Sequence, residues 1–151
     1  MNENEVAIVG GAGFVGSRLT ARFNKGSVFS RRYDIDLTNQ LDRSIYLDVE
    51  DIDTLDKLAG VSTIINLAAV HRDDVRPLSR YDDVNVQGAK NVCDAACKHG
   101  INQIIFTSSV AIYGFAPADT DETGESNYFN DYGRTKYLAE QVYKAWQSED
   151  P

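Results

Sequence analysis

The segment G-G-A-G-F-V-G, residues 10–16, decides the fold of this chain. It follows the short apolar run Glu5–Gly10 and opens Phe14–Asn24, in which apolar residues recur at helical spacing. The pattern G-x-G-x-x-G starts at Gly11 and ends at Gly16. Between a buried strand and a helix, such glycines allow a tight turn and the close approach of a pyrophosphate to the helix N-terminus. The segment therefore predicts a dinucleotide-binding loop, with a turn that merely requires glycine as the alternative.

Short apolar runs alternate with helical segments along the rest of the chain. Further strands are predicted at Val28–Asp34, Ser44–Leu47, Thr63–Leu67 and Gln103–Thr107. Further helices are predicted at Ile52–Leu58, at residues 89–97 with a cap at Gly100, and from about Tyr132 to Gln147. This alternation is typical of a parallel sheet with helices on both faces. The sequence predicts one domain over residues 1–151, a doubly wound α/β fold of the Rossmann type.

One predicted strand, Val28–Asp34, is irregular, because Ser30, Arg31 and Arg32 suit a buried strand poorly. Its prediction rests on its place in the alternation. Asp34 lies 18 residues after Gly16 (34 − 16), close to the spacing at which an acid binds the adenosine ribose. A carboxylate there favours NAD, whereas a neighbouring arginine would favour the extra phosphate of NADP. NAD is the favoured cofactor, and NADP remains possible.

The composition fits a globular domain, with 42% hydrophobic and 25% charged residues. The net charge of −8 (15 Lys+Arg against 23 Asp+Glu) disfavours nucleic acid and anionic membranes as partners. No apolar run is long enough to span a membrane, and the polar start is unlike a signal peptide. The two cysteines, Cys93 and Cys97, are expected to be small buried residues, and we expect a cytoplasmic protein. His71 and His99 are far apart, so no metal site is predicted.

Tyr132 and Lys136 lie four residues apart in the last predicted helix, and therefore on one face of it. A phenol ordinarily has a pKa of about 10, and a nearby ammonium lowers that pKa. Such a tyrosine can exchange protons near neutral pH. A solvated surface pair is the common alternative for this spacing.

Four motifs follow one another in the order typical of a known family. They are the glycine loop, N-L-A-A at Asn66–Ala69, T-S-S-V-A-I-Y-G at Thr107–Gly114, and Y-G-R-T-K at Tyr132–Lys136. In this order they resemble the extended short-chain dehydrogenase/reductase family. The chain is most similar to its NAD-dependent epimerase/dehydratase group, which acts on nucleotide sugars. The resemblance extends from Val6 to about Trp146.

This resemblance implies a set of site residues. Its implied catalytic residues are Ser109, with Ser108 as the alternative register, Tyr132 and Lys136. Its implied cofactor-binding residues are Gly10, Gly13, Phe14, Val15, Gly16, Asp34, Asp48, Val49, Leu67, Ala68, Ala69, Asn85, Tyr132 and Lys136. Asp48 and Val49 would reach the adenine, although an exposed turn aspartate is the alternative for Asp48.

The implied reaction is hydride transfer between a sugar carbon and the nicotinamide, with a UDP-sugar as the favoured substrate. Tyr132 would exchange the hydroxyl proton, Lys136 would hold the nicotinamide ribose, and Ser109 would bind the reacting oxygen. Dehydratases of this family carry Asp-Glu after the catalytic residue, whereas Ser109 is followed by Val110-Ala111. An epimerase is favoured over a dehydratase. A keto-reductase or dehydrogenase using NADP, and a non-catalytic dinucleotide-binding module, remain as alternatives.

Members of the family also continue beyond these motifs into a smaller domain that binds the sugar nucleotide. We therefore expect this chain to hold the cofactor site, to lack most of the substrate site, and to be weakly active or inactive alone. The strand at Gln103–Thr107 would then have an unpaired edge. The last helix carries an apolar stripe formed by Leu138, Ala139, Val142, Tyr143 and Trp146. Both features predict a homo-oligomer.

Overall fold

A computed structural model describes residues 5–26, 28–38 and 44–149. Its strands are β1 (Val6–Val9), β2 (Ser30–Asp34), β3 (Ser44–Tyr46), β4 (Thr63–Asn66) and β5 (Gln103–Phe106). Its α-helices are α1 (Phe14–Asn24), α2 (Ile52–Leu55), α3 (Ser79–Tyr81), α4 (Gly88–His99) and α5 (Asp131–Ser148). Two 3-10 turns, η1 (Asp56–Leu58) and η3 (Val110–Ile112), and one π-helical segment, η2 (Asp82–Gln87), complete the order.

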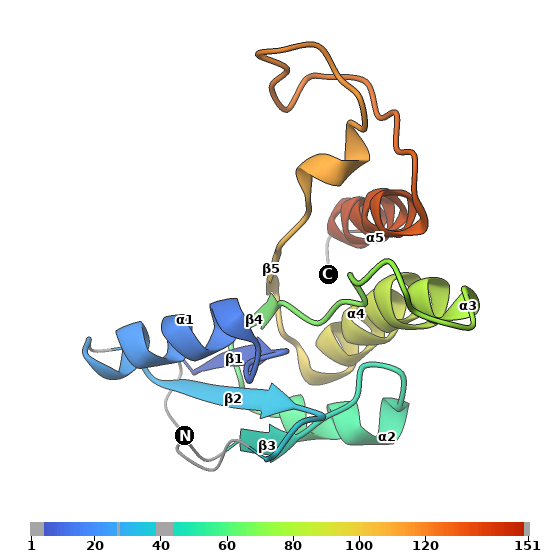
Figure 1. The fold of residues 1–151 in the computed structure, drawn as a ribbon. Helices are drawn as coiled ribbons and strands as arrows, with labels where there is room; N and C mark the ends of the chain where they lie inside the picture. Colours follow the sequence, from blue (N-terminus) through green and yellow to red (C-terminus); the bar gives the residue numbers. More distant parts are fainter. Residues whose placement is uncertain (1–4, 27, 39–43, 150–151) are drawn as a thin grey trace.

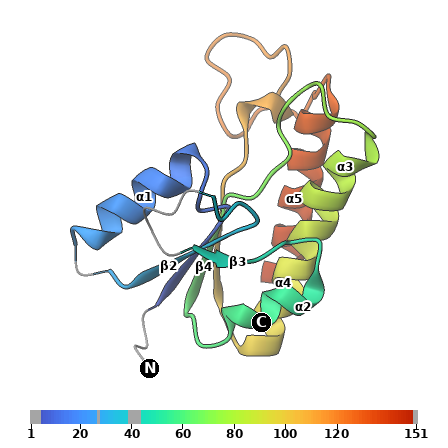
Figure 2. The same cartoon turned by 60° about the horizontal axis from the view of Figure 1, so that its bottom comes forward.

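The five strands form one parallel sheet in the order β3-β2-β1-β4-β5. Helix α1 lies on one face of this sheet, while α2, α4 and α5 lie on the other (Figures 1 and 2). The predicted doubly wound fold is therefore confirmed. The strand order reverses between β1 and β4, which is where ligands bind on sheets of this kind.

The main core lies between the sheet and α4. Ala7, Val9 and Ile64 face Val92 and Ala96 there, all of them buried. Ile8 is equally buried but lies outside this cluster, because alternate residues of a strand point to opposite faces.

The polar strand β2 is held by contacts of its own charged residues. Arg32 is only 3% exposed, and its Nε donates to Ser44 Oγ of β3 at 2.7 Å. Arg31 forms an ion pair with Glu5. The strand begins at Ser30, two residues later than predicted, and Phe29 before it is 58% exposed.

Several predicted boundaries were wrong by one or two residues. The predicted helix Ile52–Leu58 is divided into α2 and η1. Segments α3 and η2, which lead into α4, were not predicted. Gly100 ends α4 in the left-handed conformation (φ 66°), as expected of a glycine cap.

The apolar stripe of α5 is partly covered inside the chain. Ala139 is buried, and Tyr143 and Trp146 pack against the core. Asn66, the last residue of β4, donates through Nδ2 to the Tyr143 hydroxyl at 2.8 Å. Cys93 is buried as expected, but Cys97 is exposed and accepts a hydrogen bond from Trp146 Nε1 at 3.2 Å.

Candidate active site

The glycine loop joins β1 to α1 and rests on the segment after β4. Gly10 has φ 73°, and a Cβ there would lie 2.6 Å from the backbone nitrogen of Ala68. A Cβ on Gly16 would lie 2.5 Å from Gly11 Cα, so the first turn of α1 needs glycine to pack on the loop. These two glycines are required by the protein itself.

Gly13 is different, because a Cβ there would have only Gly10 O nearby, at 3.4 Å. Gly13 is the N-cap of α1, and no side chain caps this helix end. The exposed backbone N–H groups of such a helix start form an anion site. Phe14 and Val15 follow it and are 73% and 54% exposed. The loop therefore fits a diphosphate that approaches Gly13.

Asp34, at the end of β2, lies against this loop. Its Oδ2 accepts from the backbone N–H of Ala12 at 2.7 Å, and its Oδ1 accepts from that of Asp36 at 2.9 Å. Of the two neighbouring arginines, Arg31 pairs with Glu5, and Arg32 packs its stem against Gly11 of the loop while its Nε donates to Ser44 Oγ. This arrangement fits a ribose with free hydroxyls better than one that carries a phosphate.

Asp48 and Val49 lie in a turn after β3. Asp48 Oδ1 accepts from the backbone N–H of Glu50 at 3.0 Å, which is an Asx turn. Val49 is 5% exposed and belongs to the core, and its carbonyl accepts from Asn91 Nδ2 at 2.8 Å. Both residues thus have structural contacts, and their contact with adenine stays a prediction.

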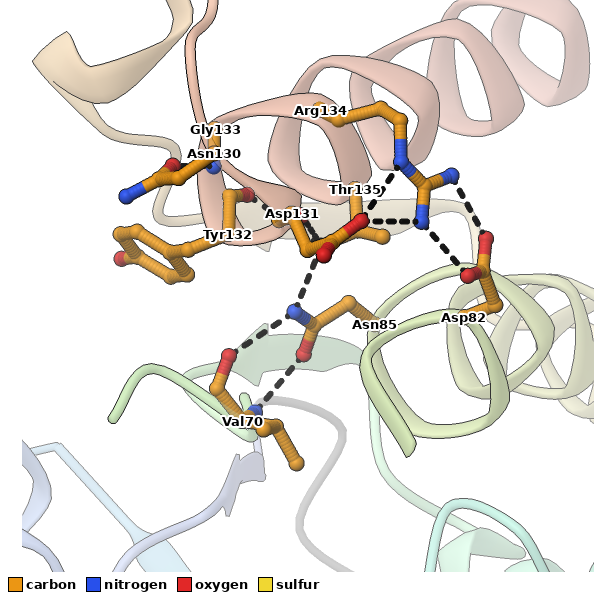
Figure 3. A network of polar contacts seen from close by, with 9 residues as sticks. All are labelled: Val70, Asp82, Asn85, Asn130, Asp131, Tyr132, Gly133, Arg134 and Thr135. Carbon is orange, nitrogen blue, oxygen red and sulfur yellow. Dashed lines mark hydrogen bonds and ion pairs between the residues drawn. The ribbon is translucent and has the colours of Figure 1, made fainter. Parts of the chain in front are cut away.

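The segment Leu67–Ala69 continues β4 at the carboxyl edge and is half-buried. Asn85 of η2 fixes the next residue, Val70 (Figure 3). Its Oδ1 accepts from Val70 N at 2.8 Å, and its Nδ2 donates to Val70 O and to Thr135 Oγ1, each at 2.9 Å. Asn85 therefore connects the segment after β4 with α5.

Ser109 stands at the turn after β5, where it is the N-cap of η3. Its Oγ accepts from the backbone N–H of Ala111 at 3.1 Å. Together with Ser108 it lines a hollow of about 610 Å³ between the following loop and Glu140 of α5. That loop is closed at its base, where Asn127 N donates to Ile112 O at 2.8 Å. A substrate oxygen placed in the hollow can therefore reach Ser109.

Tyr132 lies in the first turn of α5, which is fixed against η3. Asn130 caps the helix by accepting from the backbone N–H of Gly133 at 2.8 Å. A Cβ on Gly133 would lie 2.4 Å from Ala111 O, so this turn sits directly on η3. The Tyr132 ring points away from the polar cluster around Arg134 (Figure 3). Its hydroxyl makes no hydrogen bond with the residues that the structure describes.

Lys136 is buried one turn further along, with 3% of its surface exposed. Its Nζ lies 4.1 Å from the centre of the Phe106 ring. Burial lowers the pKa of Lys136 to about 8, against the weaker opposite effect of the Glu140 carboxylate. Within the described ranges no carboxylate forms an ion pair with this ammonium. A bound hydroxyl group or anion would therefore stabilise it.

Phe106 and Glu140 were not predicted as neighbours of the site. Phe106 is 30 residues from Lys136 (136 − 106), and nothing in the sequence indicates their contact. Glu140 follows Lys136 by four residues, a helical spacing from which their proximity could have been predicted. Across residues 5–26, 28–38 and 44–149, no group of three metal-ligating side chains could hold a metal ion. No helix in those ranges is long and apolar enough to cross a membrane.

The family model for the NAD dependent epimerase/dehydratase family matches residues 6–150. The chain belongs to this family. The family resemblance inferred from the sequence motifs is therefore confirmed, and the epimerase/dehydratase fold accounts for the parallel sheet and the glycine loop.

Relatives within the epimerase/dehydratase family differ in substrate. The chain is 44% identical, over its whole length, to N-acetyl-alpha-D-glucosaminyl-diphospho-ditrans,octacis-undecaprenol 4-epimerase of Escherichia coli O157:H7, and covers 46% of it. It is 29% identical to UDP-glucose 4-epimerase of Rhizobium meliloti, over 95% of this chain and 47% of that one. The crystal structure of UDP-glucose 4-epimerase from Brucella ovis in complex with NAD matches with a TM-score of 0.88 and 28% identity, over 96% of this chain and 48% of that one. The chain spans about half the length of these relatives.

Proposed function

We propose that this chain forms the NAD-binding and catalytic half of a 4-epimerase that acts on a diphosphate-linked sugar. The observation that carries the proposal is the buried Lys136 ammonium, which has no carboxylate partner among the described residues and lies one turn from Tyr132. A buried cation of this kind is costly unless it serves a ligand. NAD is the proposed cofactor, since the Asp34 carboxylate contacts the glycine loop while Arg31 pairs with Glu5 and Arg32 Nε donates to Ser44.

NAD, when bound, supplies a hydride acceptor and donor. The diphosphate of the cofactor would lie on the N-terminus of α1 beside Gly13, with the adenosine ribose on Asp34. Lys136 would hold the nicotinamide ribose, and Tyr132, one turn earlier on the same helix, would exchange the proton.

The chemical step is an oxidation followed by a reduction. Tyr132 would take the proton of the sugar hydroxyl as the carbon that bears it is oxidised to a ketone, with bound NAD as the hydride acceptor. Ser109 donates a hydrogen bond to the ketone oxygen. When the ketone is reduced on its other face, Tyr132 would return the proton to the same oxygen, so that the two steps together change only the configuration of the sugar carbon.

Two carriers of the sugar are compatible with this chemistry. A UDP-sugar is the carrier expected from the sequence motifs. A sugar on a polyprenyl diphosphate is favoured by the 44% identity to the Escherichia coli enzyme, against 29% for the Rhizobium meliloti one. Both present a sugar next to a diphosphate, so the residues of this chain would act in the same way.

We also propose that the protein forms a homo-oligomer in the cytoplasm. Strand β5 is at the edge of the sheet, and Ile105 within it is 46% exposed. An exposed apolar edge strand pairs readily with another chain. The cytoplasm is supported by the free thiols of Cys93 and Cys97.

The proposed function is tested in two stages. Titration calorimetry with NAD and NADP should give binding of NAD in preference to NADP. Turnover should then be measured with UDP-N-acetylglucosamine, UDP-glucose and polyprenyl-diphospho-N-acetylglucosamine, using the natural full-length protein beside this chain. The Tyr132→Phe variant should bind NAD normally and lose turnover. A chain that binds neither dinucleotide, or a full-length Tyr132→Phe variant with normal turnover, would contradict the proposal.

A further inference from the structure

Arg134 lies between Tyr132 and Lys136 in the sequence, but its side chain points toward η2 (Figure 3). Its Nη1 donates to Asp82 Oδ1 at 2.9 Å and its Nη2 to Asp82 Oδ2 at 2.6 Å. A two-pronged pair of this kind fixes both distance and orientation between its partners. The pair joins the first turn of α5 to η2, and its two partners are 52 residues apart in the numbering of the chain.

The same guanidinium also binds the start of its own helix. Its Nε and Nη2 donate to Asp131 Oδ1 at 3.2 and 3.1 Å. The Asp131 carbonyl in turn accepts from the Thr135 hydroxyl at 2.7 Å. The pairing lowers the pKa of Asp82 and raises that of Arg134, so both stay charged at neutral pH. Arg134, two residues after Tyr132, is therefore bound to η2, and Asp131, the residue before Tyr132, is bound to Arg134.

This anchorage matters because the Tyr132 hydroxyl has no partner of its own in the described part of the chain. The position of the hydroxyl then depends on the backbone of the first turn, and helix ends are the parts of a helix that open most easily. Segment η2 carries Asp82 and, three residues later, Asn85, which holds the segment after β4 through Val70. One segment thus contacts both sides of the proposed site.

We propose that Arg134 and Asp82 are positioning residues, whose ion pair sets the place of the Tyr132 hydroxyl relative to the cofactor-lining segment after β4. The inference rests on the proposed function, in which Tyr132 exchanges the proton. The side chains of the pair are 31% and 46% exposed, so the pair contributes little to stability. Its effect is on geometry, and misplacement of a reacting group by about 1 Å can lower a rate about a hundredfold.

The test follows Tyr132 directly, in the full chain labelled with [¹³Cζ]tyrosine. Its NMR resonance is the one missing from the Tyr132→Phe variant. The Tyr132 resonance is recorded with and without saturating NAD in four proteins. These are the wild type, Asp82→Asn, Arg134→Gln and the variant that carries both substitutions. We expect each single variant to move the resonance and to reduce its NAD-induced shift by at least about half, as expected when a positioned group is released. The double variant should be no worse than the more severe single variant.

A matched control lies nearby. Arg80 and Glu50 also form a two-pronged ion pair, with Nη2 and Oε2 2.7 Å apart, and it joins α3 to the turn after β3. Glu50→Gln should leave the Tyr132 resonance and its response to NAD unchanged. Arg134→Lys keeps the positive charge but loses the two-pronged donor of the guanidinium. It should shift the Tyr132 resonance as much as Arg134→Gln does, in a fully folded protein.

The outcomes separate the two proposals. An unchanged Tyr132 resonance in Asp82→Asn and Arg134→Lys overturns the positioning role, as does an equal displacement in Glu50→Gln. If NAD binds the wild type without shifting the Tyr132 resonance, the proposed function fails. In that case the Tyr132 resonance recorded without NAD, compared between the wild type and the Arg134 variants, still tests whether Arg134 positions Tyr132.

Discussion

The Asp34 carboxylate accepts a hydrogen bond from the backbone N–H of Ala12, in the middle of the glycine loop, at 2.7 Å. The end of β2 and the loop after β1 are therefore one structural unit. Because the contact orients a negative charge over the loop, it bears on the choice between NAD and NADP.

Asp34→Asn keeps an acceptor for Ala12 but removes the charge that repels a ribose phosphate. We expect the preference for NAD over NADP to fall by about tenfold, the size of one charge-assisted hydrogen bond. Calorimetric titration with both dinucleotides checks this. Asp36→Asn is the control, since the Asp36 carboxylate accepts hydrogen bonds from Thr38 in an exposed turn and its backbone contact with Asp34 is kept. An unchanged preference in Asp34→Asn would show that Asp34 does not select the cofactor.

Gly13→Ala should weaken NAD binding with little loss of stability, whereas Gly16→Ala should destabilise the fold. At Gly13 a Cβ is 3.4 Å from its nearest neighbour, so we expect a change in the free energy of unfolding below about 1 kcal/mol. The methyl group would stand where the diphosphate approaches, and NAD affinity should fall by more than about tenfold. At Gly16 the clash at 2.5 Å should destabilise the fold by about 2 kcal/mol or more. Urea unfolding and NAD titration of both variants distinguish the two roles.

The buried Lys136 makes stability depend on pH. Its pKa is about 8 in the folded chain against 10.5 for an ordinary lysine, so the unfolded chain binds more protons between these values. Stability should therefore rise with pH from about 8 to about 10.5 through this group. Lys136→Met should be more stable than the wild type at pH 7, by at most about 3 kcal/mol, and the difference should shrink over that window. Urea unfolding of both proteins at several pH values measures it.

Glu140→Gln should lower the pKa of Lys136 further, because the Glu140 carboxylate acts against the effect of burial. The rate of reaction of Lys136 with a lysine reagent, measured against pH, reports this value. Lys144→Met is the control, since it removes the partner of Glu140 at 3.5 Å and keeps the carboxylate. A higher Lys136 pKa in Glu140→Gln would contradict the assignment.

Ile105→Lys should weaken self-association. A charge in an edge strand opposes pairing with a second strand. Ile105 is 46% exposed, so the lysine should be tolerated by the fold. Sedimentation velocity over a range of concentrations should show a shift of the variant toward monomer. Identical profiles for the two proteins would mean that β5 is not the interface.

The parts of this molecule that repeat a local pattern were predictable. The glycine loop, the alternation of strands and helices and the cap at Gly100 depend on neighbouring residues, and the structure confirms them. The weak strand β2 was placed only by its position in the alternation. Its arginines are accommodated by Glu5 and Ser44, contacts between distant segments that no local pattern contains.

The same distinction holds in the candidate site. Ser109, Tyr132 and Lys136 were predicted from motif order, and the surroundings of each side chain were not. The Phe106 ring under Lys136, the hold of Asn85 on Val70 and the pair between Arg134 and Asp82 each join distant residues. The strand order places the ends of β4 and β5 side by side, and the packing of α5 on η2 brings Arg134 to Asp82.

The hydrogen bond between Asn127 and Ile112 closes the loop that follows η3 at its base. Residues 115–126 therefore leave and return at a fixed point, and Phe115 within them stacks on Phe129 with the ring centroids 4.7 Å apart. We expect changes of length or composition between residues 116 and 126 to leave Ser109 and Tyr132 in place, because this hydrogen bond lies between that segment and both residues. We infer that the piece of chain facing the hollow can differ with the sugar or its carrier while Ser109, Tyr132 and Lys136 are kept.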